Sequence, residues 1–402
     1  MSKKSKEIKI GVLIDRVIPG GAEKIAIKQV QTLRELGYDA RLLVINKVDK
    51  KGMEGKPFLD IMGKIPIEYL SDRIPKFLRF DFKFPFFSFF SFFHFSYPFL
   101  IPFTVKRKEF DIIISHGTYT CFTAMALARR REIPYAAYIW DPITYILSKG
   151  YPKGPIKLFR FILLPIAIFL DKQILNNASF LLVGGQAHNE YFQKISNKEI
   201  HVIPPSYNPI SKLPSKRGDY LLAVTAWKPG KDPEYFFKLM KFFPKFKLKL
   251  VGSWLSKEYK ETYEKEVIAN GLTKQIEVLG AVSENELVEL YSKARVLIQI
   301  NDDRGFGMPA LEAAACGCPF IIPRGQGVCD LFDDKVDGFF IKEKDWDQIV
   351  KTLSLLMGSE RTSWKMGSHA WKVVCEKYSW RKHVERLLSI FRSVLEEGES
   401  MR

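Results

Sequence analysis

The sequence predicts an α/β protein with two domains, each built on a parallel β-sheet with helices on both faces. Its 402 residues are more than one ordinary core holds and suit two domains of about 200 residues each. Short apolar runs rich in β-branched residues alternate with helix-length stretches in both halves, as expected for parallel strands joined by helices. A polar, proline-rich stretch at 204–218 separates the halves and indicates a linker.

The expected strands repeat one plan in both halves. The chain opens with a strand at 8–14, a glycine-containing loop and a helix from Ala22 to Leu36 that Gly37 closes. A helix at 284–294 has Ser283 as its expected N-cap. The other expected strands lie at 41–45, 111–115, 135–139, 180–183, 220–225, 247–251, 276–279, 296–300 and 319–322. We therefore predict a first domain over 1–205 and a second over 206–377, facing each other across a cleft with ligands at the carboxyl ends of the strands.

Charge is distributed unevenly between the halves. Residues 1–205 contain 31 Lys and Arg against 18 Asp and Glu, whereas residues 206–402 contain 31 against 27. A basic first half could attract nucleic acid, anionic lipid headgroups or phosphorylated substrates. No nucleic-acid-binding motif accompanies the charge, so nucleic acid is not an expected partner.

The cysteines and the N-terminus favour a reduced, cytoplasmic protein. The five cysteines are scattered, and Cys316-Gly-Cys318 lies in an apolar run where small buried residues are expected, so no metal site is predicted. No apolar segment typical of a secretory signal precedes Asp15.

One segment is unusually aromatic. Residues 82–103 contain eleven phenylalanines, and Ser88, Ser91 and His94 form a narrow polar stripe between them. Such a helix can lie in a membrane interface; the alternative is a buried helix of the first domain. A second candidate is the apolar run 156–170, which includes Lys157 and Arg160. We expect contact with an anionic membrane surface.

The strongest chemical signal is the stretch 304–319, Arg-Gly-Phe-Gly-Met-Pro-Ala-Leu-Glu-Ala-Ala-Ala-Cys-Gly-Cys-Pro. It follows an expected strand and turns through Gly305 and Gly307 into a helix, and glycine lets the backbone approach a ligand closely. A helix N-terminus offers free N–H groups and a positive dipole end, which suit a diphosphate. Glu312, one turn into the helix, could accept hydrogen bonds from a ribose. A glycine-rich turn without a ligand is the alternative interpretation.

This stretch resembles the sugar-nucleotide signature of the retaining glycosyltransferases of family 4, which have the GT-B fold of two Rossmann-like domains. The resemblance extends over nearly the whole chain, through the glycine loop Gly20-Gly21-Ala22-Glu23 to the end of the chain. It implies metal-independent transfer of a sugar from a nucleotide-sugar donor such as a GDP- or UDP-sugar, without a further cofactor. It also implies that the C-terminal helix, 378–402, packs back on the first domain.

The resemblance assigns a donor site and an opposing loop. It implies that Lys231, Arg304 and the Gly305–Gly307 backbone hold the diphosphate, that Glu312 holds the ribose, and that the Gly20-Gly21 loop with Glu23 closes on the phosphates or the acceptor. The remaining donor-site candidates are Lys228, Phe306, Met308 and Leu311.

Three positions depart from the family pattern. Arg304 replaces a glutamate, Ala226 an arginine that precedes the phosphate lysine, and Trp140 a histidine near the reacting sugar. Arg304 or Lys228 could supply the missing positive charge. Asp141, beside Trp140, could orient the acceptor or stabilise positive charge at the anomeric carbon. His116, at the end of a strand, is a second catalytic candidate; the alternative is an ordinary loop histidine.

The sequence therefore predicts a cytoplasmic glycosyltransferase on the inner face of the cell membrane, with a polyprenyl-linked, glycolipid or glycan acceptor. The alternative is a catalytically degenerate GT-B protein that acts as a membrane-associated binding or partner subunit. The sequence predicts no oligomeric state.

Overall fold

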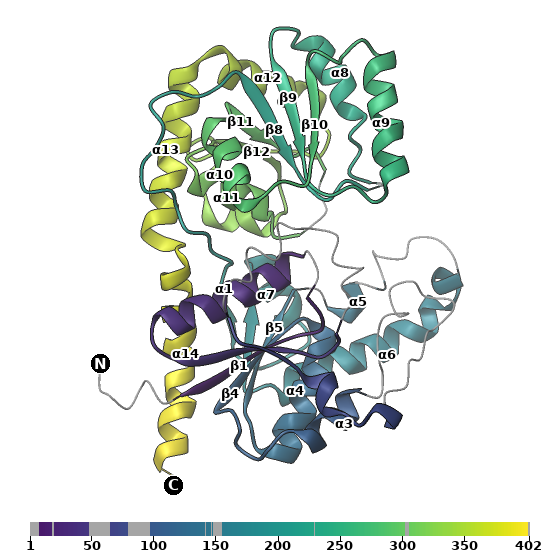
Figure 1. The fold of residues 1–402 in the computed structure, drawn as a ribbon, viewed down its shortest axis with the longest axis vertical. Helices are drawn as coiled ribbons and strands as arrows, with labels where there is room; N and C mark the ends of the chain where they lie inside the picture. Colours follow the sequence, from purple (N-terminus) through teal and green to yellow (C-terminus); the bar gives the residue numbers. More distant parts are fainter. Residues whose placement is uncertain are drawn as a thin grey trace. The chain divides into compact units, whose positions relative to one another are not determined.

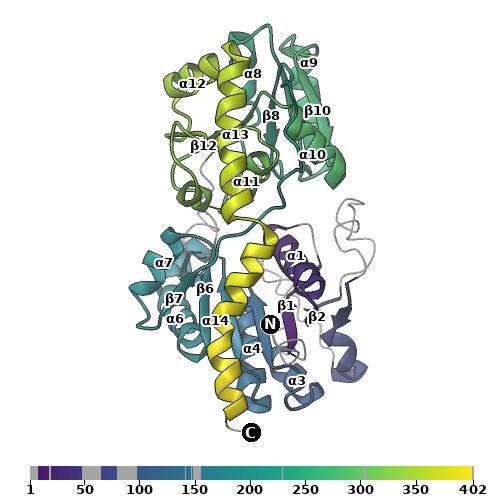
Figure 2. The same ribbon diagram turned by 90° about the vertical axis from the view of Figure 1, so that its left-hand side faces the viewer.

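A computed structural model describes residues 8–17, 20–47, 65–78, 97–140, 142–145, 147, 155–228, 230–301 and 305–400. The described chain forms two compact units, each built on its own sheet (Figures 1 and 2). The first unit contains the described residues up to Ile203 together with the chain from Val384 onward, and the second contains Pro204–His383.

The sheet of the first unit has seven parallel strands in the order β3-β2-β1-β4-β5-β6-β7. Its inner strands are almost wholly buried, because helices cover both faces (Figure 1). The strand order reverses between β1 and β4, which makes their carboxyl ends the expected ligand position. The strands are β1 Lys9–Ile14, β2 Asp39–Val44, β3 Ile67–Tyr69, β4 Ile112–His116, β5 Tyr135–Ile139, β6 Phe180–Val183 and β7 Ile200–Val202.

The helices of the first unit include one from the far end of the chain. Phe391 of α14 is buried, and its ring packs 5.4 Å from that of Phe180 in β6. The helices are α1 Gly21–Glu35, α3 Tyr97–Thr104, α4 Thr118–Arg131, α5 Ile143–Tyr145, α6 Pro155–Asn177, α7 Gln186–Gln193 and α14 Trp380–Ser400, with short 3-10 turns η3 Leu70–Arg73 and η4 Lys76–Leu78.

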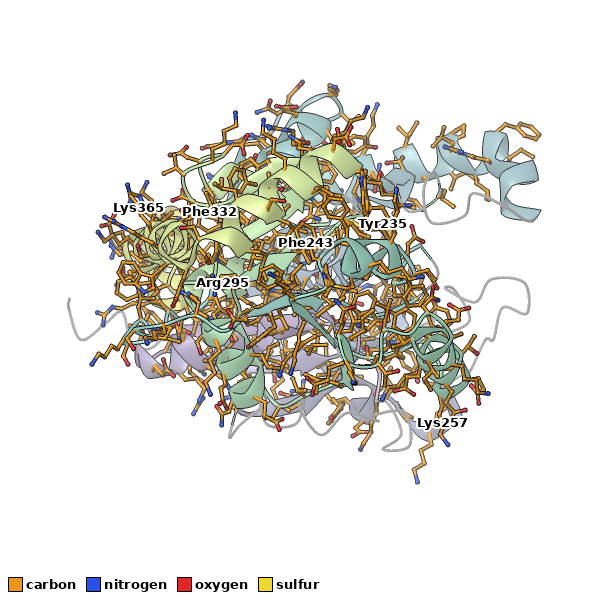
Figure 3. The ribbon with its side chains drawn as sticks, turned by 90° about the horizontal axis from the view of Figure 1, so that it is seen from above. Tyr235, Phe243, Lys257, Arg295, Phe332 and Lys365 are labelled. Carbon is orange, nitrogen blue, oxygen red and sulfur yellow. The ribbon has the colours of Figure 1, made fainter. Side chains whose placement is uncertain are left out.

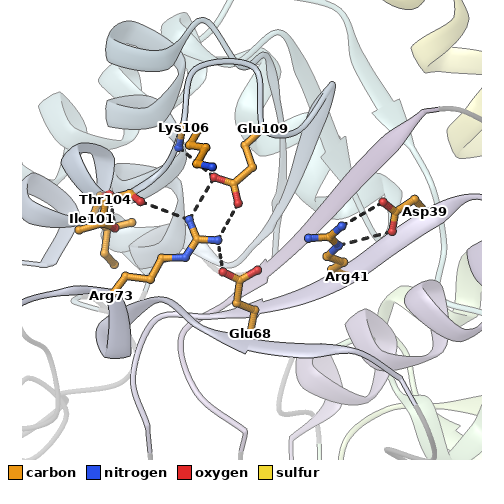
Figure 4. A network of polar contacts seen from close by, with 8 residues as sticks. All are labelled: Asp39, Arg41, Glu68, Arg73, Ile101, Thr104, Lys106 and Glu109. Carbon is orange, nitrogen blue, oxygen red and sulfur yellow. Dashed lines mark hydrogen bonds and ion pairs between the residues drawn. The ribbon is translucent and has the colours of Figure 1, made fainter.

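A guanidinium network fastens the edge strand β3 to the segment that leads into β4 (Figure 4). Arg73 donates to both carboxylate oxygens of Glu109, at 3.1 and 2.6 Å, and also pairs with Glu68 of β3. The hydrogen bonds from Arg73 lower the pKa of Glu109. Bidentate pairing of this kind fixes geometry as well as charge.

The second unit has six parallel strands in the order β10-β9-β8-β11-β12-β13. Figure 3 shows Phe243 and Phe332 within this unit, whereas Lys257 and Lys365 point away from it. The strands are β8 Tyr220–Val224, β9 Lys247–Val251, β10 Ile276–Gly280, β11 Val296–Ile298, β12 Phe320–Pro323 and β13 Phe339–Ile341. The helices are α8 Tyr235–Phe242, α9 Lys257–Ala269, α10 Glu284–Lys293, α11 Met308–Ala315, α12 Trp346–Gly358 and α13 Glu360–Lys377, with η7 Gly327–Leu331.

The predicted fold class is confirmed. Each expected strand is present within two residues of its expected bounds, and Ser283 caps α10 in a reciprocal capping box with Glu286. Three short edge strands, β3, β7 and β13, were not predicted.

The aromatic segment 82–103 is described only from Tyr97, so the polar stripe of the predicted interfacial helix, Ser88, Ser91 and His94, lies outside the described residues. In α3, Tyr97 and Ile101 are buried, while Phe99 and Phe103 are exposed. No helix in the part of the chain that the structure describes has both the length and the apolar content needed to cross a membrane.

Helix α13 approaches the end of α11 closely through a glycine. A Cβ atom at Gly367 would lie 1.9 Å from the carbonyl oxygen of Gly317, a backbone atom that cannot move independently. A Cβ atom at Gly358, in α12, would meet nothing within 4 Å.

We expect Gly367→Ala to destabilise the protein by about 1–3 kcal/mol or more, because the added methyl group overpacks the contact between α13 and α11. Gly358→Ala is the matched control and should be neutral or stabilising by up to about 1 kcal/mol. Urea unfolding followed by circular dichroism measures both changes. Equal stability of the two variants would show that α13 and the end of α11 do not pack as described.

Candidate functional site

A pocket lies at the carboxyl edge of the second sheet, where the strand order reverses between β8 and β11. Its lining comes from the ends of these two strands and the loops that follow them. The lining residues are Ala223, Val224, Thr225, Trp227, Lys231, Phe236, Ile298, Gln299, Ile300 and Asn301.

Trp227 anchors the loop that follows β8. Its backbone N–H donates to Ser253 at 2.7 Å, and its indole N–H donates to the carbonyl of Val251 at 3.1 Å. Its carbonyl accepts from the N–H of Leu255 at 2.9 Å, and its ring stacks on Trp254 with centroids 5.7 Å apart. The loop therefore has a fixed starting point against the neighbouring β9 segment.

Lys231 lines this pocket, and a backbone hydrogen bond fixes its position. Its N–H donates to the carbonyl of Lys228 at 3.0 Å, which closes a tight turn through Gly230, where φ is +91°. The side-chain amide of Asn301, just beyond β11, donates to the carbonyl of Gly230 at 2.6 Å. The turn thus joins the ends of β8 and β11, with Lys231 half-buried in the lining and Lys228 exposed.

The glycine loop before α11 is fixed by a second segment of backbone. The N–H of Gly327 donates to Gly305 at 3.2 Å, and the N–H of Val328 donates to Phe306 at 2.7 Å. Gly307 is the N-cap of α11 with φ of +87°, and a Cβ atom there would lie 2.4 Å from Oε1 of Gln326. Only glycine fits this position. The loop therefore presents its half-buried backbone and the start of α11 in one geometry.

Glu312 faces the interior of the second unit. It is 5% exposed, and Oε2 accepts a hydrogen bond of 2.9 Å from the hydroxyl of Tyr291 on α10. Burial, together with the Glu312 carboxylate, raises the pKa of Tyr291. Glu312 is thus a structural partner of α10, whatever it contributes to a ligand. Leu311 beside it is fully buried, and Met308 is half-buried at the start of the helix.

In the first unit, Glu23 bends back over the glycine loop. A Cβ atom on Gly20, the N-cap of α1, would lie 2.1 Å from the Glu23 carboxylate, which also accepts a hydrogen bond from its own N–H. Burial raises the pKa of Glu23 to about 7, and the charge of Asp15 adds to the effect. The side-chain carboxyl group of Glu23 therefore lies at the N-terminus of α1, with Gly21 exposed beside it.

His116 lies at the carboxyl end of β4, as its sequence position predicts. It is 4% exposed, and Nε2 shares a hydrogen bond of 2.7 Å with Oε1 of Gln29 on α1. Its ring packs against Tyr138 and Trp140 of the neighbouring strand segment, with centroids 5.0 and 6.1 Å away. Trp140 is half-buried and stacks on Tyr138 at 4.4 Å.

Of the predicted donor residues in the second unit, Lys231 lines the pocket, Lys228 lies in the same turn, and Gly305, Phe306, Gly307 and Met308 form the loop and helix start that follow β11, whereas Leu311 and Glu312 are buried in α11. Two predicted residues are not described. Asp141 and Arg304 lie outside the described residues. Within the described ranges, no group of three or more His, Cys, Asp or Glu side chains is arranged to hold a metal ion. Sequence reasoning missed Trp227, Gln299, Asn301 and Gln326, which follow strands or precede turns but match no motif.

The position of Glu23 makes stability depend on pH. Because the native pKa is raised to about 7 from 4.5, the folded state holds this proton more tightly than the unfolded chain. Stability should therefore fall as pH rises from about 4.5 to 7.

Glu23→Gln removes that loss, so we expect the variant to be more stable than the wild type at pH 8 by about 1–2 kcal/mol, with no gain at pH 4. Thermal denaturation across this pH range measures the effect. Glu35→Gln, at the exposed far end of α1, is the matched control. A Glu23→Gln variant whose pH dependence equals that of the wild type would contradict the burial of this carboxyl group.

Two adjoining family models match the chain. The model "Glycosyltransferase Family 4" matches residues 19–209, and the model "Glycosyl transferases group 1" matches residues 207–373. Together they match residues 19–373, which is most of both units.

Individual proteins give the same result. An uncharacterized glycosyltransferase of Methanocaldococcus jannaschii, MJ1178, is 27% identical over 72% of this chain and 77% of its own. The O-antigen chain mannosyltransferase RfbU of Salmonella typhimurium is 30% identical over 38% of this chain and 44% of its own. The crystal structure of Anabaena HepE in complex with UDP and glucose superposes with a TM-score of 0.72 at 17% identity, covering 96% of this chain and all of that one. With both halves matched and the two-sheet architecture in place, the chain belongs to glycosyltransferase family 4 and has the GT-B fold.

Proposed function

We propose that this family 4 glycosyltransferase transfers a sugar, with retention of configuration and without a metal ion, from a nucleotide-sugar donor to a membrane-associated or glycan acceptor. The observation that carries the proposal is the second unit's sheet edge. There Lys231 and the Gly305–Gly307 backbone are each fixed by hydrogen bonds, at the ends of β8 and β11 and before α11.

The leaving group of such a reaction is a nucleoside diphosphate, on which negative charge grows as the bond to the sugar breaks. A lysine and backbone N–H groups held in place beforehand stabilise that charge without reorganising, which is the largest catalytic term in many enzymes. In this proposal Lys231, Arg304 and the start of α11 contact the diphosphate, Lys228 adds charge from its exposed position, and Glu312 contacts the ribose.

The donor base is proposed to be uracil or guanine. Structures of HepE contain UDP and UDP-glucose, which supports a uridine donor. Thermal shifts with GDP-, UDP- and ADP-sugars, in the absence of acceptor, would identify the base.

The acceptor side belongs to the first unit in this proposal. The excess of positive charge over residues 1–205 favours an acceptor at an anionic membrane surface, on the cytoplasmic face. The similarity to an O-antigen chain mannosyltransferase supports a growing glycan as the group that receives the sugar. Asp141 and His116 remain the proposed catalytic residues of this side, with the Gly20-Gly21 loop closing on the phosphates or acceptor.

The second candidate function is that of a catalytically degenerate partner protein. The feature that favours it is the departure from the pattern that the resemblance implies at three positions, Arg304, Ala226 and Trp140. Hydrolysis of a nucleotide sugar by the purified protein without acceptor would support the enzyme, whereas tight binding with no turnover under any acceptor would support the partner.

Lys231→Ala should weaken nucleotide-sugar binding about 10- to 100-fold, because a charge-assisted hydrogen bond to a diphosphate contributes about 1.5–3 kcal/mol. Isothermal titration calorimetry measures the change. Lys245→Ala is the matched control, since this exposed lysine precedes β9 at the amino ends of the strands of the same sheet.

Glu312→Gln should also weaken nucleotide-sugar binding, while the amide oxygen still accepts a hydrogen bond from Tyr291. The melting temperature of this variant should therefore stay near that of the wild type. Wild-type affinity in both Lys231→Ala and Glu312→Gln would contradict the donor site.

Arg304→Glu introduces the residue that the resemblance implies at this position. We nevertheless expect the variant to weaken donor binding at least about tenfold, because Arg304 supplies positive charge in place of the arginine that the resemblance implies at position 226, where this chain has alanine. The same titration measures it, and Arg304→Gln separates loss of charge from charge reversal. A gain of affinity or turnover in Arg304→Glu would favour the degenerate protein.

A further inference from the structure

Helix α6 of the first unit carries a broad apolar face that no described part of the chain covers. Phe161 is 75% exposed and Phe169 57%. The exposed apolar residues of this half are Phe161, Ile162, Pro165, Ile166, Ile168 and Phe169. At 100° per residue these six positions span an arc of about 160°, which is wider than the stripe that a helix usually packs against a core.

The other half of α6 is firmly attached to its unit. Ile174 and Leu175 are buried in the core of the first unit. The carboxylate of Asp171, 2% exposed, accepts hydrogen bonds from the backbone N–H groups of Ile143 and Thr144, at 3.0 and 3.1 Å. The exposed half therefore extends from an attached half, and Figure 1 shows that one end of α6 lies away from the sheet of the first unit.

Charge identifies the kind of partner that this face fits. From Pro142 to Leu170 the sequence contains four basic residues, Lys149, Lys153, Lys157 and Arg160, and no acidic one. The next carboxylate, Asp171, is already held by Ile143 and Thr144. A second copy of this chain would bring the same positive charge to the contact, so the charge opposes self-association, whereas anionic lipid headgroups complement it.

We propose that residues 160–170 of α6 insert into the headgroup and upper acyl region of an anionic bilayer. Eleven helical residues are about 16 Å long, about half of a hydrocarbon core, so the segment enters one leaflet and does not span the membrane. The phenylalanines and isoleucines provide apolar burial, and the net positive charge of the sequence before and at Arg160 adds attraction to anionic headgroups. The lipid-linked acceptor is the only part of this assignment that rests on the proposed function.

The attachment of α6 connects the membrane contact to the candidate acceptor side. Asp171 holds the first residues of α5, which begin two positions after Asp141 and three after Trp140. A lipid-linked substrate in the same leaflet would therefore be near the carboxyl end of β5.

Co-sedimentation with vesicles tests the proposal without any sugar donor. The wild type should bind phosphatidylcholine vesicles that contain phosphatidylglycerol, bind vesicles of phosphatidylcholine alone much less, and lose part of its binding in high salt. The double substitution Phe161→Ser and Phe169→Ser should lower the membrane partition constant at least about tenfold, because burial of even one phenylalanine contributes about that factor. The matched control is Ile268→Ser with Leu355→Ser, two exposed apolar side chains on helices of the second unit, which should bind as the wild type does.

Three results would overturn the proposal: a wild type that ignores anionic vesicles, a double variant that binds them unchanged, or a wild-type dimer that the double variant abolishes in sedimentation velocity. If the double variant fails to fold, Lys157→Glu with Arg160→Glu tests the same surface by charge reversal and should abolish the preference for anionic vesicles; an unchanged preference overturns the proposal. Donor binding, measured by calorimetry, should be unaffected in every α6 variant. Absent vesicle binding with intact donor binding refutes the membrane assignment alone.

Discussion

The candidate donor site depends on the hydrogen bonds that close the carboxyl ends of β8 and β11 in the second unit. Parallel strands leave their last carbonyl and N–H groups to the loops that follow, and buried backbone groups must find partners. Here the partners are other loops and turns. Trp227 bonds to the end of β9 and the segment that follows it, and Asn301 bonds to Gly230. The carbonyls of Gly305 and Phe306 accept from the N–H groups of the first two residues of η7. These bonds place a lysine and a glycine-rich helix start on one edge of the sheet before any ligand arrives.

The same constraint explains why Glu312 is bound to Tyr291. Helix α11 is short and almost wholly buried, so a carboxylate on its inner side needs a donor from within the protein. That donor also fixes the helix against α10. In the proposed donor site Glu312 serves structure and ligand together, whereas a glutamine there keeps an oxygen that accepts from Tyr291 and removes the charge of the carboxylate.

Most of the fold could be predicted from the sequence because the inner strands are buried on both faces, and burial on both faces imposes continuous apolar runs. The three strands that were missed, β3, β7 and β13, are three-residue edge strands, and β3 and β7 have no fully buried position. Lys231 and the Gly305–Gly307 loop were predicted because they match a motif. Gln299, Asn301 and Gln326 were not predicted, because their positions depend on tertiary contacts that no local pattern records: Gln299 lines the pocket, Asn301 bonds to Gly230, and Gln326 lies against Gly307.

The carboxyl end of β5 in the first unit is aromatic. At the position where the resemblance implies a histidine, Trp140 stacks on Tyr138, and the nearby His116 is buried against Gln29. An aromatic surface binds a sugar or an isoprenoid by contact area and orients it by shape, whereas an imidazole would act through hydrogen bonds. This aromatic surface suits the partly apolar acceptor proposed above, and the exposed apolar half of α6 belongs to the same unit.

The central claim is that the second unit's sheet edge holds the diphosphate of a nucleotide sugar. A crystal structure with UDP or GDP bound tests it most directly. The account predicts diphosphate oxygens within about 3 Å of the Lys231 ammonium group and of backbone N–H groups between Gly305 and the first turn of α11. A nucleotide whose diphosphate lies away from both Lys231 and this glycine loop would contradict the account.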